Sequence, residues 1–364
     1  MKFLPDGIGL YIHIPFCRHK CLYCDFYSAI ISEKVYKDYI AALLRAVKFW
    51  GGRIDSPVDT VYFGGGTPSV LGEDIVPLMR GIRSKFNVLP DAEITAECNP
   101  DSDRSFLRAA KKCGVNRLSI GVQAGNDGRL KALGRAHTVS DVRKTVSAAR
   151  QAGFNNISCD IMIALPDSTL KTLKEDIGFV CSLDPEHISA YILKIEQNTA
   201  FYARHSSLNL LDEDSAADQY LFLSSFLENL GYEHYEISSF AKEGKKSRHN
   251  LKYWQCREYL GLGPSAHSFL RGERFFYPRD LKAFIVGNSP VADGVGGGKT
   301  ERLMLALRTN GGVPVSCFSP AAKSKAEEFK KAGLLRITGD RAVLTDKGML
   351  LSNSIITELF YEDL

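Results

Sequence analysis

The chain has 364 residues, of which 45% are hydrophobic and 24% charged, the composition of a folded globular protein with one large domain and a smaller one. Its net charge of +4 is too small to indicate a nucleic-acid-binding protein, and the densest basic run, KEGKKSR (242–248), is interpreted as a solvated loop. No run approaches the roughly 18 apolar residues of a membrane span and no signal-peptide cleavage site follows the N-terminus, so we expect a cytoplasmic protein with no integral membrane segment, whose nine cysteines are thiols or metal ligands.

The first half of the chain alternates strand-like and helix-like segments. Runs rich in β-branched and aromatic residues predict strands at 9–14, 58–63, 92–97, 117–122, 157–163 and 187–192. Helices are predicted between them, for example at 32–50, 101–114, 138–153 and 168–183. This series of βα units predicts an α/β fold with a parallel sheet. We favour closure into a full or partial barrel, although an open doubly wound sheet has the same pattern.

The second half of the chain is less regular. A long helix is predicted at 213–230, and the glycine-rich segment GNSPVADGVGGG (287–298) is interpreted as a linker or mobile loop. The elements predicted after it are helices at about 300–309 and 320–332, a hairpin within 334–348 and a final helix at about 348–360. The regions expected from these patterns are a core domain at 1–235, a connecting region at 236–297 and a smaller C-terminal winged-helix-like α/β domain at 298–364.

The stretch CRHKCLYC places Cys17, Cys21 and Cys24 just after the first predicted strand. On a parallel αβ barrel, the loops after the strands build the functional face. A structural zinc site normally has four ligands in paired Cys-x2-Cys knuckles, and no second knuckle exists because the other cysteines are scattered singly. A [4Fe–4S] cluster normally has four cysteine ligands. Three cysteines therefore predict a cluster with one iron left open for a substrate or cofactor.

A second motif, YFGGGTPS (62–69), follows the second predicted strand. Three consecutive glycines let a backbone approach a ligand closely, and the segment is neither a Walker A loop nor a dinucleotide fingerprint. We therefore expect ligand contact here. Polar residues also occur at or near the strand ends, namely Glu97, Gln123, Arg135 and Asp160. We expect them to form a polar pocket, in which Asp160 needs hydrogen-bond donors because its neighbours are apolar.

These motifs resemble those of the radical S-adenosylmethionine (SAM) superfamily, and within it the oxygen-independent coproporphyrinogen III oxidase family. The resemblance rests on the Cys-x3-Cys-x2-Cys motif, on GGGTP after the next strand, and on EITAECNP, RLSIGVQ, CDIMIALP, YEISSFA and YLGLGPSAH. It implies an α/β fold with a partial (β/α)6 barrel of the TIM type. It also implies that Cys17, Cys21 and Cys24 ligate three irons of a [4Fe–4S] cluster. SAM would chelate the fourth iron, and reduction of the cluster would cleave SAM to a 5′-deoxyadenosyl radical.

The resemblance also implies which residues bind SAM. They are Tyr11 and Tyr23 beside the cluster and adenine, Gly65, Gly66 and Thr67 at the methionyl end, and Glu97, Gln123, Arg135 and Asp160 at the polar groups. Among these, Asp160 is the candidate for the ribose hydroxyls. The protein would bind, orient and shield cofactors that carry the difficult chemistry.

Three departures from the oxidase point to its relatives, the HemW-type haem chaperones. Phe26 stands where the oxidase has a further cysteine, the first strand begins near residue 8 without the oxidase's N-terminal extension, and HNLKYW matches the HNxxYW signature of the chaperones. His249 is a reasonable group for haem iron, and Tyr253 and Trp254 offer flat apolar faces for a porphyrin. The alternative is that His249 and its neighbour fix the preceding loop while the aromatic rings lie in the core.

The resemblance thus implies a chaperone that binds a [4Fe–4S] cluster, SAM and haem, and that delivers haem to respiratory apoproteins. Whether SAM is cleaved and whether the chain forms a homodimer stay open. The alternative function is oxidative decarboxylation of coproporphyrinogen III, an activity that Phe26 argues against. A zinc protein whose winged-helix-like region contacts DNA is a third alternative, and the absence of a second cysteine knuckle disfavours it.

Overall fold

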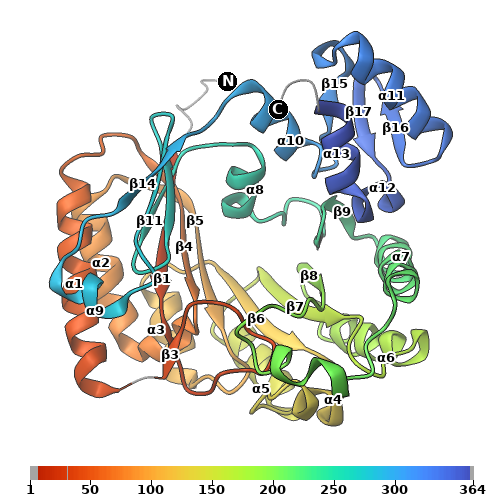
Figure 1. Cartoon of the computed structure of the whole chain (residues 1–364). Coiled ribbons are helices and arrows are strands. Elements are labelled where there is room, and N and C mark those ends of the chain that lie inside the picture. The colour runs from red at the N-terminus through yellow and green to blue at the C-terminus, as the bar shows by residue number, and fades with distance from the viewer. Residues whose placement is uncertain (1–6, 31, 361–364) are drawn as a thin grey trace.

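The computed structural model describes residues 7–30 and 32–360, and its main feature is a curved sheet with helices packed along its outer side (Figure 1). The predicted strands of the first half are present as β1 (Ile8–Ile14), β4 (Val58–Gly65), β5 (Val88–Cys98), β6 (Arg117–Gln123), β7 (Ile157–Ile163) and β8 (His187–Ile192). The helices between them are α1 (Glu33–Gly51), α2 (Ile75–Lys85), α3 (Arg104–Lys112), α4 (Asp127–Ala132), α5 (Val139–Gln151) and α6 (Leu170–Cys181). The alternation predicted from the sequence is therefore confirmed.

The strand order distinguishes a partial barrel from a doubly wound sheet. Strands β1, β4, β5, β6, β7 and β8 are neighbours in chain order, and every adjacent pair is parallel. A doubly wound sheet reverses its strand order at a switch point, whereas unreversed right-handed crossovers place every helix on one side. The fold is thus a partial (β/α)6 barrel. Its sheet does not close, because it continues into further strands at both edges.

The barrel strands alternate apolar side chains toward the helices with polar side chains toward the interior. In β4, for example, Val61 and Phe63 are fully buried in the core between sheet and helices, whereas Thr60 and Tyr62 alternate with them. The interior residues contributed by the other strands include Tyr11, His13, Glu93, Thr95, Glu97, Arg117, Ser119, Ser158, Asp160, His187 and Ser189. A TIM barrel is usually filled by branched apolar side chains, so this polar interior indicates a binding function.

The second half of the chain extends the sheet at both edges. At one edge, β10 (Ser239–Ala241) pairs antiparallel with β8 and with β9 (Glu233–Glu236), after helix α7 (Glu213–Asn229). At the other edge, β11 (Tyr259–Leu262) pairs parallel with β1 and is followed by the antiparallel strands β12 (His267–Leu270), β13 (Glu273–Phe276) and β14 (Val291–Val295). Between β13 and β14 lies α9 (Leu281–Val286).

The prediction that residues 287–298 form only a linker or loop is wrong at its centre, because β14 pairs with β13. All five residues of β14 are exposed, so the strand lacks the alternation of buried and exposed positions by which a strand is recognised in a sequence.

The last part of the chain packs helices on a small three-stranded sheet. It consists of α10 (Lys299–Ala306), β15 (Val313–Pro314), α11 (Pro320–Lys331), β16 (Leu335–Thr338), β17 (Arg341–Leu344), α12 (Asp346–Leu350) and α13 (Ser352–Phe360). The single final helix predicted at about 348–360 is divided at Leu351 into two helices, the first of which starts at Asp346 after the capping Thr345 side chain. Within 7–30 and 32–360, no helix is long and apolar enough to cross a membrane.

Candidate cofactor site at the mouth of the partial barrel

The three motif cysteines lie on the loop that follows β1, at the carboxyl ends of the barrel strands. This loop starts at β2 (Phe16–Cys17), which pairs with β3 (Ala29–Ile30), and the thiols of Cys17, Cys21 and Cys24 are half-buried. Two backbone hydrogen bonds hold its centre: Leu22 N–H donates to the Leu133 carbonyl at 3.2 Å, and Phe201 N–H donates to the Leu22 carbonyl at 2.9 Å. The loop is therefore fixed from both sides. We call residues 17–30 the cysteine loop.

Arg135 connects the cysteine loop to the ends of two strands. Its guanidinium donates to Cys21 Sγ at 3.1 Å, to Asn99 Oδ1 at 2.8 Å and to the Gly121 carbonyl at 3.0 Å. Asn99, which sequence reasoning did not single out, also donates to Thr67 Oγ1 at 3.4 Å. Thr67 in turn lies 3.5 Å from Cys17 Sγ. Of the three motif sulfurs, Cys21 thus has a guanidinium as its neighbour and Cys17 has a hydroxyl.

Within the described ranges, no group of three or more His, Cys, Asp or Glu side chains could hold one metal ion. A [4Fe–4S] cluster does not require such a group, because each cysteine binds a different iron. Burial, opposed by a backbone hydrogen bond from Phe26, raises the pKa of the Cys24 thiol, so iron binding there would release a proton. The donor set of three thiols on one loop therefore fits a cluster with one open iron.

The glycine turn after β4 packs against β1 and the cysteine loop. A side chain at Gly65, whose φ is +111°, would lie 2.4 Å from the His13 ring, and one at Gly66 would lie 2.7 Å from the Phe16 carbonyl oxygen. Gly66 N–H also donates to the Ile14 carbonyl at 2.8 Å. Close packing within the protein thus accounts for glycine at both positions. Ligand contact at this turn stays a prediction.

Glu97 lies at the end of β5, directly against the glycine turn. Its carboxylate accepts hydrogen bonds from the Tyr62 hydroxyl at 3.0 Å and from Gly65 N–H at 3.2 Å. Burial, and next the charge of Asp160, raise the pKa of Glu97 to about 7. The residue therefore changes charge near neutral pH and could bind an ammonium group in its ionised form.

Asp160 lies in the interior on β7 and has the donors that its burial requires. Its carboxylate accepts hydrogen bonds from the Ser119 hydroxyl at 3.0 and 3.1 Å and from the Ser158 hydroxyl at 3.3 Å. Burial raises the pKa of this carboxyl, and the serine donors oppose that shift. Sequence reasoning did not identify Ser119 or Ser158, although each is placed at an inward position by the alternation of its strand.

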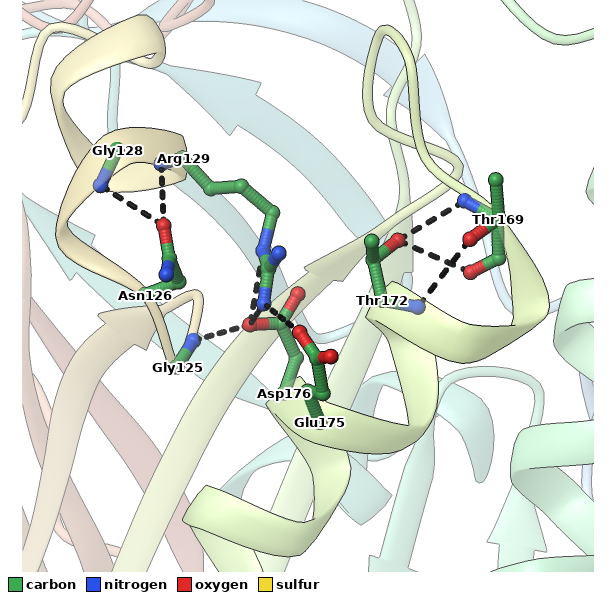
Figure 2. Close-up of polar contacts among 8 residues, drawn as sticks. All are labelled: Gly125, Asn126, Gly128, Arg129, Thr169, Thr172, Glu175 and Asp176. Atoms are coloured by element: carbon green, nitrogen blue, oxygen red, sulfur yellow. Dashed lines mark hydrogen bonds and ion pairs between the residues drawn. The ribbon is translucent and has the colours of Figure 1, made fainter.

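An ion pair between a buried carboxylate and a partly exposed guanidinium holds the turn after β6 (Figure 2). The carboxylate of Asp176 in α6 accepts hydrogen bonds from Gly125 N–H and from the Arg129 guanidinium, the latter at 2.8 and 3.1 Å. A side chain at Gly125 would lie 2.7 Å from Phe179 Cβ, so glycine lets α6 approach the turn. The turn begins at Gln123, whose φ is +69°. The pair thus fixes the backbone that directs Gln123 toward the barrel mouth.

The two tyrosines of the predicted SAM site occupy different places. Tyr23 lies on the cysteine loop against Phe201, with 6.5 Å between ring centroids. Burial raises the pKa of the Tyr23 hydroxyl above its ordinary value, and the nearby Arg135 guanidinium opposes that shift. Tyr11 lies inside the barrel, where its hydroxyl is 3.0 Å from His13 Nδ1 and its ring stacks on Tyr62. Tyr23 is thus beside the cysteines, and Tyr11 forms the wall beneath the mouth.

The HNxxYW segment lies at the opposite end of the barrel, on α8 (Arg248–Trp254), which covers the amino ends of β4 and β5 (Figure 1). His249 is buried, with Nδ1 2.8 Å from Thr60 Oγ1 and Nε2 2.9 Å from the Tyr253 hydroxyl. Burial lowers the pKa of His249 to about 3, so the ring is neutral. Trp254 is half-buried at the end of the helix. The structure therefore places His249 at the amino end of the barrel, where its ring stacks on Tyr62, which hydrogen-bonds Glu97. The three cysteines lie at the opposite end.

Comparison with known proteins agrees with this arrangement. The family model described as the radical SAM superfamily matches residues 11–180, and that of the HemN C-terminal domain matches residues 300–351. The heme chaperone HemW of Bacillus subtilis (strain 168) is 35% identical over 367 residues, covering 95% of this chain and 97% of the relative. HemW of Escherichia coli (strain K12) is 40% identical over 271 residues, covering 71% and 69%.

Among solved structures, coproporphyrinogen III oxidase (HemN) from Escherichia coli, described as a radical SAM enzyme, superposes with a TM-score of 0.82 at 23% identity, covering 97% of this chain and 90% of that one. At that identity the similarity concerns the fold. The long sequence matches show the rest: the chain belongs to the HemN family of radical SAM proteins and, within it, to the HemW type.

Proposed function

We propose that this chain is a cytoplasmic haem chaperone that binds a [4Fe–4S] cluster through Cys17, Cys21 and Cys24, binds SAM beside it, and delivers haem to respiratory apoproteins. The observation that carries the proposal is the cysteine loop itself, fixed at the barrel mouth by Arg135. The haem-chaperone part of the proposal is supported by the relatives, which are named heme chaperones. When bound, a reduced cluster with SAM on its open iron supplies one-electron chemistry.

The residues of the mouth have complementary tasks in this proposal. Arg135 orients Cys21 through one hydrogen bond and the ends of β5 and β6 through two others. Glu97, fixed by Tyr62 and Gly65, would receive the ammonium group of the methionyl end. Asp160 would accept hydrogen bonds from the ribose hydroxyls, because a carboxylate has about four acceptor sites and the hydroxyls of Ser119 and Ser158 do not occupy all of them.

The absence of the oxidase's further cysteine supports haem handling over decarboxylation. Phe26, at that position, is 71% exposed beside the cysteine loop's ligands and offers an apolar ring where the oxidase has a thiol. A phenyl ring has no group that ligates a metal or transfers a proton, so Phe26 cannot take over a role of the oxidase's thiol.

Cofactor binding is tested on protein reconstituted anaerobically with iron and sulfide. We expect a brown protein whose reduced cluster gives an electron paramagnetic resonance signal that changes when SAM is added. Incubation with coproporphyrinogen III, reductant and SAM should form no protoporphyrinogen. A signal that SAM does not alter would contradict the SAM site, and protoporphyrinogen formation would contradict the chaperone proposal.

A further inference from the structure

A chain of buried hydrogen bonds leads away from Asp160 through the barrel interior. The Ser158 hydroxyl, which donates to Asp160, lies 2.8 Å from Nδ1 of His187, the residue paired with Ser158 on the neighbouring strand β8. Nε2 of His187 lies 2.8 Å from the Tyr235 hydroxyl on β9, and that hydroxyl accepts a hydrogen bond from Ser247 N–H at 3.2 Å. The chain thus runs from a residue of the predicted SAM site to Ser247.

The members of this chain are shielded from solvent. Ser158, His187 and Ser247 are fully buried, and Tyr235 is 1% exposed. A buried polar group that loses its partner costs more free energy than an exposed one, because water cannot replace the missing hydrogen bond. Each hydroxyl and ring nitrogen of the chain therefore depends on its protein neighbour.

The direction of each hydrogen bond follows from the two ends of the chain. In its ionised form the Asp160 carboxylate only accepts, so the one hydroxyl hydrogen of Ser158 is directed to it. The oxygen of Ser158 then accepts from His187, whose Nδ1 carries a hydrogen. Burial lowers the pKa of His187 well below its ordinary value, so the ring is neutral and Nε2 is an acceptor. The Tyr235 hydroxyl therefore donates to Nε2, and its oxygen accepts from Ser247 N–H.

This direction makes His187 responsible for the orientation of the Ser158 hydroxyl. A serine hydroxyl rotates to suit its surroundings, but the N–H of His187 occupies one side of the Ser158 oxygen and leaves its hydrogen directed at Asp160. The Ser119 hydroxyl lies 3.1 and 3.0 Å from the two carboxylate oxygens and does not distinguish them, whereas Ser158 contacts Oδ1 alone, at 3.3 Å. Ser158 therefore fixes the rotation of the carboxylate, and His187 fixes Ser158.

The far end of the chain is the first turn of the helix that carries the HNxxYW segment. Ser247 is the N-cap residue of α8, and its hydroxyl accepts a hydrogen bond from Asn250 N–H at 3.3 Å. Its own N–H is held by Tyr235. The chain thus joins the start of α8 to a carboxylate of the predicted SAM site.

We propose that His187 is a positioning residue for SAM: acting through Ser158, it holds the Asp160 carboxylate in the orientation that accepts hydrogen bonds from the ribose hydroxyls. The inference rests on the proposed function, in which Asp160 binds the ribose. A histidine that only fills space in the interior would, when removed, weaken every ligand of the barrel mouth alike. A positioning role affects only ligands that carry ribose hydroxyls.

The test compares two ligands by isothermal titration of the cluster-loaded chain, SAM and a SAM analogue that lacks both ribose hydroxyls. Wild type should bind SAM about tenfold or more tightly than the analogue, because hydrogen bonds to a charged group are strong. His187→Leu, which removes both ring nitrogens, should lower the affinity for SAM by about threefold to tenfold and leave the affinity for the analogue unchanged. His187→Asn, whose amide can donate to Ser158 in place of Nδ1, should restore most of the preference.

His234→Leu is the matched control. It removes another buried histidine, whose ring nitrogens lie 3.2 Å from the Tyr220 hydroxyl and 2.9 Å from an Asp346 carboxylate oxygen, in contacts separate from the chain. This variant should lose stability and keep the preference of wild type for SAM over the analogue.

The outcomes separate the inference from the proposed function. If wild type prefers SAM and His187→Leu keeps that preference, or loses affinity for both ligands equally, His187 does not position Asp160 and the inference is overturned. If wild type binds both ligands equally, the assignment of Asp160 to the ribose fails and the inference fails with it, although SAM binding stands. If wild type does not bind SAM, the proposed function itself fails.

Discussion

The imidazole of His249 and the hydroxyl of Thr60 lie 2.8 Å apart inside the barrel, at the end away from the cysteine loop. The other ring nitrogen of His249 lies 2.9 Å from the Tyr253 hydroxyl, and the ring stacks on Tyr62 with centroids 5.2 Å apart. His249 thus closes the floor of the barrel, above which Tyr62 supports Glu97. These contacts support the alternative interpretation of the HNxxYW segment, in which its histidine and aromatic side chains pack in the interior of the protein.

The first prediction concerns this floor. His249→Ala should lower the free energy of unfolding by about 2–4 kcal/mol, because it leaves a cavity and deprives two buried hydroxyls of their partner. Tyr253→Phe is the control, since it keeps the ring and removes one hydrogen bond, and it should cost about 1 kcal/mol. Urea unfolding measures both. A His249→Ala protein within about 0.5 kcal/mol of wild type would contradict the structural role.

The second prediction concerns the cluster. Cys21→Ser should remove the iron, sulfide and visible absorption of the reconstituted protein while the barrel stays folded, because the thiol is half-buried on a loop outside the core. Cys256→Ser is the control, because Cys256 lies far along the chain and outside the motif, and that variant should retain the cluster. Chemical analysis and far-UV circular dichroism measure the two properties. Full iron and sulfide content in Cys21→Ser would refute the ligand assignment.

The third prediction concerns the ion pair in Figure 2. The carboxylate of Asp176 is 5% exposed and that of Glu175 is 52% exposed, yet both lie near the Arg129 guanidinium. Asp176→Ala should cost about 1.5–3 kcal/mol, because it removes the hydrogen bonds that a buried carboxylate makes to the partly exposed Arg129 guanidinium and to the Gly125 N–H. Glu175→Ala, which removes an exposed pair, should cost less than about 1 kcal/mol.

Because Asp176 fixes the turn that carries Gln123, Asp176→Ala should also weaken SAM binding while the cluster is retained. Isothermal titration with SAM and iron analysis of the same preparation separate the two effects. Equal stability of the two variants, or unchanged SAM affinity in Asp176→Ala, would show that the pair does not position the site.

The fourth prediction is a pH dependence. Burial, and then Asp160, raise the pKa of Glu97 to about 7, whereas the carboxyl in the unfolded chain titrates near its ordinary value. Between these values the folded state retains a proton that the unfolded chain releases, so the contribution of Glu97 to stability falls as the pH rises and is constant above about 7. The loss amounts to up to about 3 kcal/mol.

Glu97→Gln isolates this contribution, because the amide does not titrate. We expect urea unfolding to show wild type losing stability relative to Glu97→Gln as the pH rises from about 5 to about 8. Parallel curves for the two proteins would mean that Glu97 is ionised throughout and that its pKa is not raised.

The barrel could be predicted from the sequence because its strands have a strong local signal. Strands β7 and β8 have the bounds predicted for them, since each alternates apolar residues with an inward polar set that begins at Ser158 and His187. The sheet extension β11–β14 was not predicted, because its strands are short and every residue of β14 is exposed. Such strands are defined by distant backbone pairing, which leaves little trace in local composition.

The sequence predicts which residues a cofactor site would contain, but it does not predict how they are arranged. The spacing of the cysteines indicates a cluster ligand set, and the inward positions of Glu97 and Asp160 follow from strand alternation. The depth at which His249 lies depends on how α8 packs under the barrel, which no local pattern specifies. The role of Asp176 could not be predicted either, because its partner Gly125 is 51 residues away in the chain. The two become neighbours only when α6 packs against the turn after β6.

The central proposal is haem handling by a radical SAM fold, and the most direct measurement is an anaerobic haem titration of the cluster-loaded wild-type chain. We predict a saturable Soret shift at a fixed stoichiometry, and transfer of the bound haem to an added apoprotein. A Soret absorbance that rises with haem as it does in buffer alone, without saturation, would contradict the proposal.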